Sequence, residues 1–186
     1  NKSFKPEDVK QTLNKWIVGE VAKTKHYMDN SLAQYRFNDT ANGLYSFIWG
    51  KVCDWYVELS KPLFQGDDAE IKRETQQTMA WALDQCLIVL HPIMPFITEE
   101  IWLELKSKLK LQEETIMLRP YPSYQTSRLN KNAKNEINWI KQFIIGVRQI
   151  RGEMNIPPGK ILPVIVQKSN NEDELFIEKY LGLIKY

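Results

Sequence analysis

The stretch from Arg36 to Pro62 constrains the fold more than any other part of this chain. Its apolar residues recur at three- and four-residue steps, so they share one face of a long helix; they are Phe37, Ala41, Leu44, Ile48, Val52, Trp55, Leu59 and Leu63. Pro62 predicts the end of this helix, because proline disfavours helical geometry in the residue before it. A helix over about 36–64 is roughly 40 Å long at about 1.5 Å per residue, a length typical of helical bundles.

Apolar periodicity predicts further helices before and after this one. They cover residues 6–33, with Pro6 in the first turn, and 68–90, with Asp68 as N-cap. A fresh first turn is expected at Thr98, and another helix over 131–154. Residues 111–129 contain Pro120 and Pro122 and are predicted to be irregular. The chain is therefore expected to be mainly α, an antiparallel helix bundle.

The period changes near the C-terminus. Ile161–Val166 is short, β-branched and bounded by turn residues, so a strand is predicted there, followed by a helix from Asn170 to Tyr186. A lone strand is not stable by itself. We therefore expect two parts: a helical bundle over residues 1–155, and the truncated start of a small α/β subdomain over 156–186.

Composition sets limits on the class of protein. The chain has 186 residues, 43% of them hydrophobic and 26% charged, which is ordinary for a soluble globular protein. The net charge of +2 says little about partners. No apolar run is long enough to span a bilayer, and the polar start of the chain contains no secretory signal. A cytoplasmic protein without a membrane partner is predicted.

The sequence contains no recognisable catalytic or metal-binding motif. It lacks a glycine-rich phosphate loop and any nucleophile motif. Cys53 and Cys86 form no Cys-x-x-Cys pair, so they are predicted to be buried thiols and not metal ligands. His91, which precedes a proline, is expected to cap the preceding helix. Adjacent Glu99 and Glu100 point about a hundred degrees apart on a helix and are expected to compensate its dipole.

What remains is a pattern typical of a binding surface. Cations, amides and aromatic rings lie together, and single-stranded RNA is read by base stacking on aromatic planes with lysine or arginine on the phosphates. The candidate RNA-binding residues are Arg36, Phe37, Asn38, Trp49 and Lys51 on the long helix, with Arg148 and Arg151 on one face of the helix at 131–154.

Two features of the long helix leave alternatives open. Trp55 and Tyr56 are expected to lie in the core, because such rings are usually buried, whereas Trp49 is either core or surface. Gly43 and Gly50 are seven residues apart and predict close approach by a neighbouring helix or by an RNA backbone. A helical protein-interaction scaffold is the competing interpretation of the aromatic stripe.

Six runs of residues resemble the anticodon-binding helical domain of the valyl-tRNA synthetases; they are Arg36–Ala41, Leu44–Trp49, Cys53–Pro62, Leu90–Trp102, Ile116–Pro122 and Val147–Lys160. The His-Pro-x-Met-Pro-Phe-x-Thr-Glu-Glu run within Leu90–Trp102 is shared with isoleucyl and leucyl relatives, so the same domain of one of those enzymes is an alternative. The Cys-Asp-Trp-Tyr and Glu-Met-Asn-Ile-Pro-Pro runs favour the valine enzymes.

The resemblance implies a parent enzyme that activates valine with ATP and magnesium and transfers it to tRNA. The family's nucleotide-binding signatures, His-Ile-Gly-His and Lys-Met-Ser-Lys-Ser, do not occur in this sequence. The resemblance therefore implies that this chain has no catalytic residue and no cofactor of its own. Its expected partner is the anticodon arm of valine tRNA, and the parent is expected to be a monomeric cytoplasmic enzyme.

Overall fold

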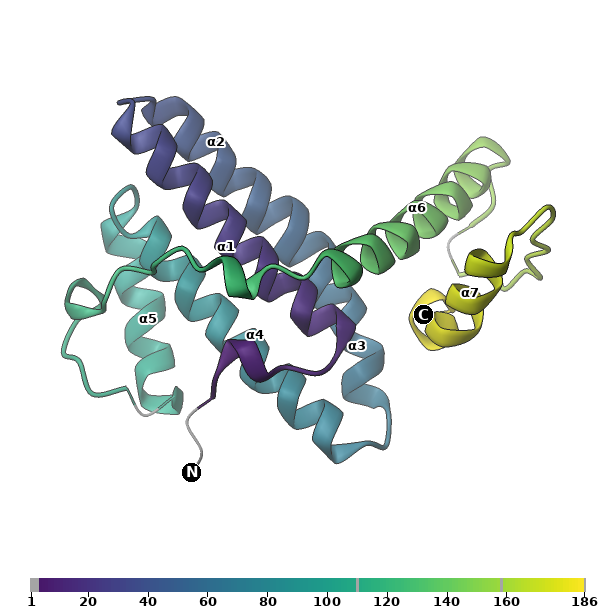
Figure 1. Ribbon diagram of the computed structural model, residues 1–186, viewed down its shortest axis with the longest axis horizontal. Coiled ribbons are helices and arrows are strands. Elements are labelled where there is room, and N and C mark those ends of the chain that lie inside the picture. Colours follow the sequence, from purple (N-terminus) through teal and green to yellow (C-terminus); the bar gives the residue numbers. More distant parts are fainter. Residues whose placement is uncertain (1–3, 110, 158, 186) are drawn as a thin grey trace. The chain divides into compact units, whose positions relative to one another are not determined.

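A computed structural model describes residues 4–109, 111–157 and 159–185 of the chain, and these residues are mainly α-helical (Figure 1). The prediction of a mainly α helix bundle is confirmed. The chain divides into two compact units, one up to Lys131 and the other from Asn132 onward. This division does not test the domain boundary predicted after residue 155, which stays a prediction.

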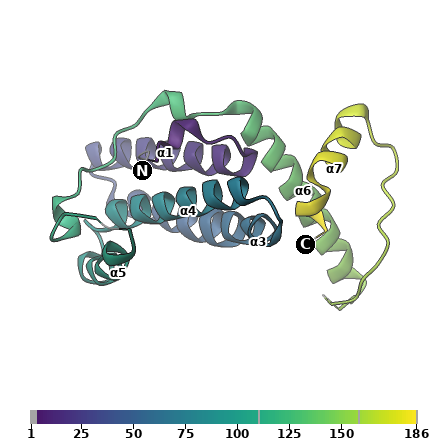
Figure 2. The ribbon, with the colours of Figure 1, turned by 90° about the horizontal axis from the view of Figure 1, so that it is seen from below.

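The first unit contains helices α1 Thr12–Ala33, α2 Phe37–Phe47, α3 Glu58–Gln65, α4 Ala69–Leu90 and α5 Pro95–Leu109. Helices α1 and α2 lie side by side as an antiparallel hairpin (Figure 1), and α4 packs against α1, α3 and α5. Figure 2 shows α1 and α4 running next to each other, seen along another direction. The predicted helix over 68–90 is confirmed by α4, and residues 111–129 are irregular apart from two short 3-10 turns.

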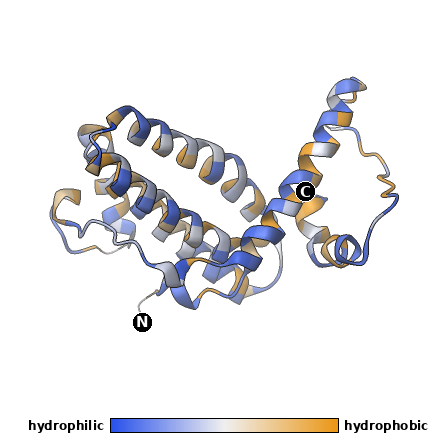
Figure 3. Ribbon diagram, turned by 45° about the horizontal axis from the view of Figure 1, so that its top comes forward, coloured by the Kyte–Doolittle hydropathy of each residue, from blue (hydrophilic) through white to orange (hydrophobic). Residues whose placement is uncertain are grey.

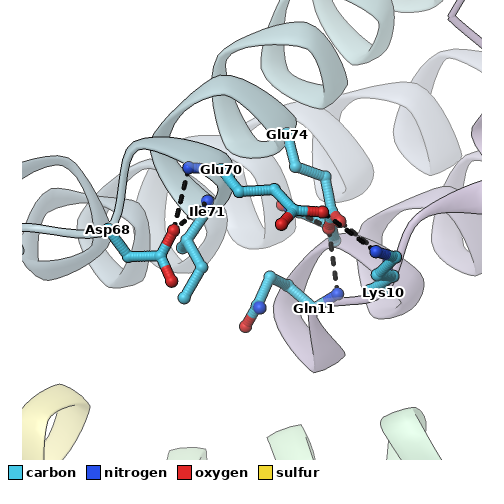
Figure 4. A network of polar contacts seen from close by, with 7 residues as sticks. Lys10, Gln11, Asp68, Glu70, Ile71 and Glu74 are labelled. Carbon is cyan, nitrogen blue, oxygen red and sulfur yellow. Dashed lines mark hydrogen bonds and ion pairs between the residues drawn. The ribbon is translucent and has the colours of Figure 1, made fainter.

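The start of α1 is fixed by a side chain of another helix. Pro6–Asp8 form a 3-10 turn and the α-helix begins only at Thr12, so the predicted start at Pro6 is wrong. Glu74 of α4 accepts hydrogen bonds from the backbone N–H groups of Lys10 and Gln11, both at 2.9 Å (Figure 4). A carboxylate at this end satisfies unpaired donors and favours the positive pole of the helix dipole.

The predicted long helix is interrupted by a π-helical segment, Ile48–Val57, which joins α2 to α3 and is called the π segment below. Pro62 lies inside α3, so the end predicted there is wrong; the helix continues to Gln65, where extended Gly66 stops it. π-helical turns are rare and occur mostly as single turns inside α-helices, often at functional sites. A run of ten residues is therefore an unusual local structure.

The π segment changes which side chains face the core. Phe47 and Tyr56 are both buried although they are nine residues apart, which is two and a half α-helical turns and would place them on opposite faces. The wider i→i+5 turn brings nine residues close to two whole turns. The Tyr56 hydroxyl donates to Asn14 Oδ1 of α1 at 2.9 Å. The core prediction is thus confirmed for Tyr56, while Trp55 is only half-buried.

The connection between α4 and α5 is tighter than predicted. Helix α5 begins at Pro95 and not at Thr98. The Nδ1 atom of His91 lies 2.8 Å from the hydroxyl of buried Thr98, so the imidazole contacts the next helix. The backbone N–H of His91 donates to Leu87 O at the end of α4. Of the two cysteines, Cys86 is buried, which raises its thiol pKa to about 12, but Cys53 is exposed, so its predicted burial is wrong.

The second unit is built on α6 Lys131–Glu153 and α7 Asn171–Ile184, which confirms the predicted helix over 131–154. The Trp139 ring of α6 packs on Phe143 and on Phe176 of α7, and its Nε1 donates to Asp173 at 2.8 Å. Asn170 and Asp173 form a reciprocal capping box at the start of α7.

The strand predicted at Ile161–Val166 does not form, and the described residues contain no strand. The segment is neither helical nor paired with a neighbouring strand. Its apolar residues appear in orange on the connection between α6 and α7 (Figure 3). A strand requires a neighbour to take its backbone hydrogen bonds. The predicted small α/β subdomain is therefore absent from the part of the chain that the structure describes.

Candidate nucleic-acid interface

The tip of the α1–α2 hairpin is held by a C-cap that normally contains glycine. The N–H of Arg36 donates to Ser31 O and the N–H of Tyr35 to Leu32 O, both at 2.9 Å, which is the Schellman pattern. Tyr35 occupies its left-handed position with a φ of 57°. A bulky residue rarely adopts this conformation, and such outliers cluster at functional sites. The Tyr35 ring is 81% exposed and meets the exposed Phe37 ring edge-on at 6.4 Å between centroids.

A row of two amides followed by two aromatic rings lines the outer face of α2 and continues into the start of the π segment. Asn38, Asn42, Tyr45 and Trp49 follow one another at steps of four, three and four residues, so they lie on one helix face. All four are exposed, Tyr45 at 68% and Trp49 at 58%. Large exposed rings next to amide donors and acceptors are what stacking and edge recognition of unpaired bases require.

A groove of about 420 Å³ lies between α1 and α2. Its lining residues include the cations Lys23 and Lys51 together with Tyr27, Asn42 and Ser46. The two glycines of this region differ in their surroundings. A Cβ on Gly43 would lie 2.5 Å from the Tyr27 ring, so the close approach here is by a side chain of the neighbouring helix. A Cβ on Gly50 would meet nothing within 4 Å.

A buried carboxylate joins the two lysines of this groove. Glu20 of α1 accepts from Lys23 Nζ at 2.7 Å and from Lys51 Nζ at 2.5 Å. Burial alone would raise the pKa of Glu20, but the hydrogen bonds from these two lysines outweigh it and lower the pKa below its ordinary value. Lys51 is therefore half-buried and held against α1, at the edge of the buried face, and not freely displayed on the surface.

The structure brings most of the predicted binding residues together on one hairpin. Arg36, Phe37 and Asn38 are exposed at the tip and the start of α2, and Trp49 is exposed at the start of the π segment. Arg36 forms an ion pair with Asp39 at 3.4 Å. The amide Asn42 and the ring of Tyr45 complete this row, and four-residue spacing from Asn38 and Trp49 is the signal that finds them.

The two predicted arginines of α6 belong to the second unit. Arg148 is exposed on the helix surface. Arg151 is half-buried, and its guanidinium donates to the carbonyl oxygens of Pro157 at 2.6 Å and Lys160 at 2.8 Å. Arg151 thus ties down the chain that follows α6, a role that its charge alone does not predict.

No group of three or more histidine, cysteine or acidic side chains among the described residues lies together as metal ligands. No helix in the described part of the chain is long and apolar enough to cross a membrane.

Comparison with known proteins identifies the class. Residues 14–166 match the model of the anticodon-binding domain of tRNA ligases, and the chain belongs to this family. Similar proteins are valine–tRNA ligases. That of Ruegeria pomeroyi is 45% identical over 95% of this chain, and those of Bartonella quintana and Brucella suis are 39% and 41% identical over 100% and 90% of it. The chain spans 17 to 20% of the length of these three relatives.

Proposed function

We propose that this chain is the anticodon-arm-binding portion of a valine–tRNA ligase, and that the outer face of α2 with the hairpin tip is its RNA-binding surface. The ligation of valine to tRNA, with its ATP and magnesium, is assigned to parts of the relatives that this chain does not match. The parent enzyme would act as a monomer in the cytoplasm.

The observation that carries the proposal is the exposed row on α2. Tyr45 and Trp49 are too exposed to serve the core, and they follow the amides of Asn38 and Asn42 along the same helix face. A base stacked on an aromatic ring contributes about 1–3 kcal/mol of binding free energy, so two such rings can account for micromolar binding together with a few phosphate contacts. Amide groups give the base-edge hydrogen bonds that distinguish one sequence from another.

Binding of a valine tRNA transcript to the 186-residue chain tests this surface. Replacing Tyr45 or Trp49 by alanine should weaken binding about 5- to 100-fold, the loss expected for one stacked base. Phe96→Ala is the matched control, because Phe96 is an even more exposed ring on a different helix. Fluorescence anisotropy gives the dissociation constants.

A second measurement tests the anticodon itself. A valine tRNA transcript with an altered anticodon should bind the unmodified chain at least tenfold more weakly, as should an unrelated tRNA. Equal binding of all three transcripts, or equal losses for Phe96→Ala and Trp49→Ala, would contradict the proposed reading surface. Failure of the chain to bind any tRNA would favour a scaffold that contacts protein.

A further inference from the structure

The groove between α1 and α2 has the features of a small binding site beside the exposed row of α2. Its volume of about 420 Å³ lies within the range of about 300–1,000 Å³ that is usual for ligand sites. Its lining combines an aromatic ring with two neutral polar groups and two ammonium groups; they belong to Tyr27, Asn42, Ser46, Lys23 and Lys51. A ring to stack on, groups that form hydrogen bonds and cations are what proteins use to hold an unpaired nucleotide.

A glycine on α2 makes room for the Tyr27 ring of α1. A Cβ at Gly43 would lie 2.5 Å from Cε1 and 2.8 Å from Cδ1 of this ring, so any larger residue would displace the ring. The ring therefore lies against the backbone of α2, while 45% of Tyr27 stays exposed at the groove. Glycine lowers the stability of a helix relative to alanine. Gly43 thus weakens α2 locally and gives an exposed aromatic ring its place in the groove.

The charges around the groove favour an anion. Buried Glu20 accepts from Lys23 Nζ at 2.7 Å and from Lys51 Nζ at 2.5 Å, and these three side chains together have a net charge of +1. An ammonium group has three donors, so each lysine keeps donors for a further acceptor. Asp39, one turn nearer to the hairpin tip, is paired with Arg36 at 3.4 Å. The described residues that line the groove include no acidic side chain.

We infer that the groove holds one unpaired nucleotide of the tRNA, whose base stacks on Tyr27 and whose phosphate is bound by Lys23 and Lys51. Asn42 and Ser46 are exposed one helical turn apart, so their side chains can form hydrogen bonds with the edge of that base. Asn42 also belongs to the exposed row of α2, so the groove continues the proposed RNA-binding surface. This assignment rests on the proposed function, because the nucleotide belongs to the tRNA that the chain is proposed to bind.

A double-mutant cycle between protein and RNA tests this assignment. Valine tRNA transcripts that lack one base each, at every position of the anticodon loop in turn, are titrated by fluorescence anisotropy against the chain and its Tyr27→Ala variant. Loss of the base held in the groove should weaken binding to the unmodified chain about 5- to 100-fold. With Tyr27→Ala the same transcript should lose less than about twofold, because the stacking ring is already absent. Tyr27→Phe keeps the ring and should behave as the unmodified chain does. Equal losses for the chain and Tyr27→Ala at every position would overturn the assignment.

Gly43→Ala is an independent variant that removes no side chain from the groove. The added Cβ displaces the Tyr27 ring, so binding of the complete valine tRNA transcript should weaken about fivefold or more. Gly182→Ala in α7 is the matched control, because a Cβ at that glycine meets nothing within 4 Å. Its affinity should stay within about twofold of that of the unmodified chain.

The outcomes separate the groove from the outer face of α2. Unchanged binding by Tyr27→Ala and Gly43→Ala, with a loss for Trp49→Ala, would overturn the groove assignment and leave the proposed surface intact. A loss for both groove variants, with none for Tyr45→Ala or Trp49→Ala, would support the groove and contradict the proposed surface. Failure of the unmodified chain to bind tRNA would overturn both.

Discussion

At the scale of single residues, Tyr35 combines conformational strain with exposure. A left-handed conformation costs a non-glycine residue roughly 1–2 kcal/mol, and here it is adopted by a large ring that is not buried. The end of α6 has the same cap: Asn155 occupies the left-handed position with a φ of 51°, and Ile156 N–H donates to Arg151 O at 2.8 Å. Asparagine tolerates this conformation through its short polar side chain. The strain at the hairpin tip therefore comes from the bulky side chain of Tyr35 and not from the Schellman cap itself.

Tyr35→Gly should stabilise the chain while weakening its binding to tRNA. Relief of the strain outweighs the extra freedom that glycine gives the unfolded chain, which leaves a gain of about 0.5–1 kcal/mol in the free energy of unfolding. Loss of the exposed ring should lower tRNA affinity severalfold. Urea denaturation and anisotropy give the two values. Asn155→Gly is the control and should change stability by only a few tenths of a kcal/mol. A destabilised Tyr35→Gly protein would show that the ring packs at the tip.

At the scale of elements, sequence patterns predicted the helices whose position depends only on nearby residues. Apolar periodicity together with Asp68 as an N-cap was enough to place α4, because both signals lie within the helix itself. The start of α1 depends on Glu74, more than sixty residues away, and no local signal marks it. The π segment escapes any search for an α-helical period, and the strand at Ile161–Val166 has no partner in the described residues.

The candidate site shows the same division between local and distant causes. Trp49 lies on an exposed helix face that the sequence marks with the amides of Asn38 and Asn42. Phe37 is exposed at the hairpin tip although it shares a face with buried Leu44. Lys51 follows buried Phe47 by four residues, at the edge of the buried face. Its pairing depends on Glu20 being opposite it on another helix, which the sequence of the π segment alone does not contain.

The contact between α1 and the π segment should make the free energy of unfolding depend on pH through Glu20. Its pKa in the folded chain lies below the ordinary value of 4.5, so its ion pairs stabilise the fold above that pH and are lost as pH falls through the lowered pKa. Glu20→Gln should cost about 1–2 kcal/mol at pH 7, because two partly exposed lysines lose a buried partner. The difference from the unmodified chain should shrink below about pH 4.5.

Denaturant titrations at pH 7 and pH 3.5 measure this difference. Glu58→Gln is the matched control, since Glu58 pairs with Lys61 at 2.7 Å while about half of each side chain is exposed. Its effect should stay within about 0.5 kcal/mol at both pH values, as for other surface ion pairs. A Glu20→Gln penalty that is the same at both pH values would show that packing, and not charge, is lost.

At the scale of the whole molecule, charge is nearly balanced, with 25 lysines and arginines against 23 acidic residues. Affinity for a polyanion therefore depends on where the cations lie. Arg36 is exposed at the tip of the hairpin, whereas Lys23 and Lys51 in its groove are half-buried and paired with Glu20. Arg36 is therefore the exposed cation that the proposed RNA-binding surface offers to a phosphate.

Salt dependence of tRNA binding should reveal this distribution. The logarithm of affinity for single-stranded RNA falls with the logarithm of salt concentration by about 0.7 per phosphate contact. Arg36→Ala should therefore weaken binding and reduce the slope by about 0.7–1, since the exposed pair with Asp39 at 3.4 Å leaves its guanidinium available to a phosphate. Lys108→Ala removes the same charge from an exposed position on α5 and should leave the slope unchanged, because α5 lies outside the proposed RNA-binding surface. Equal changes for the two variants would mean that net charge, and not the hairpin, attracts the RNA.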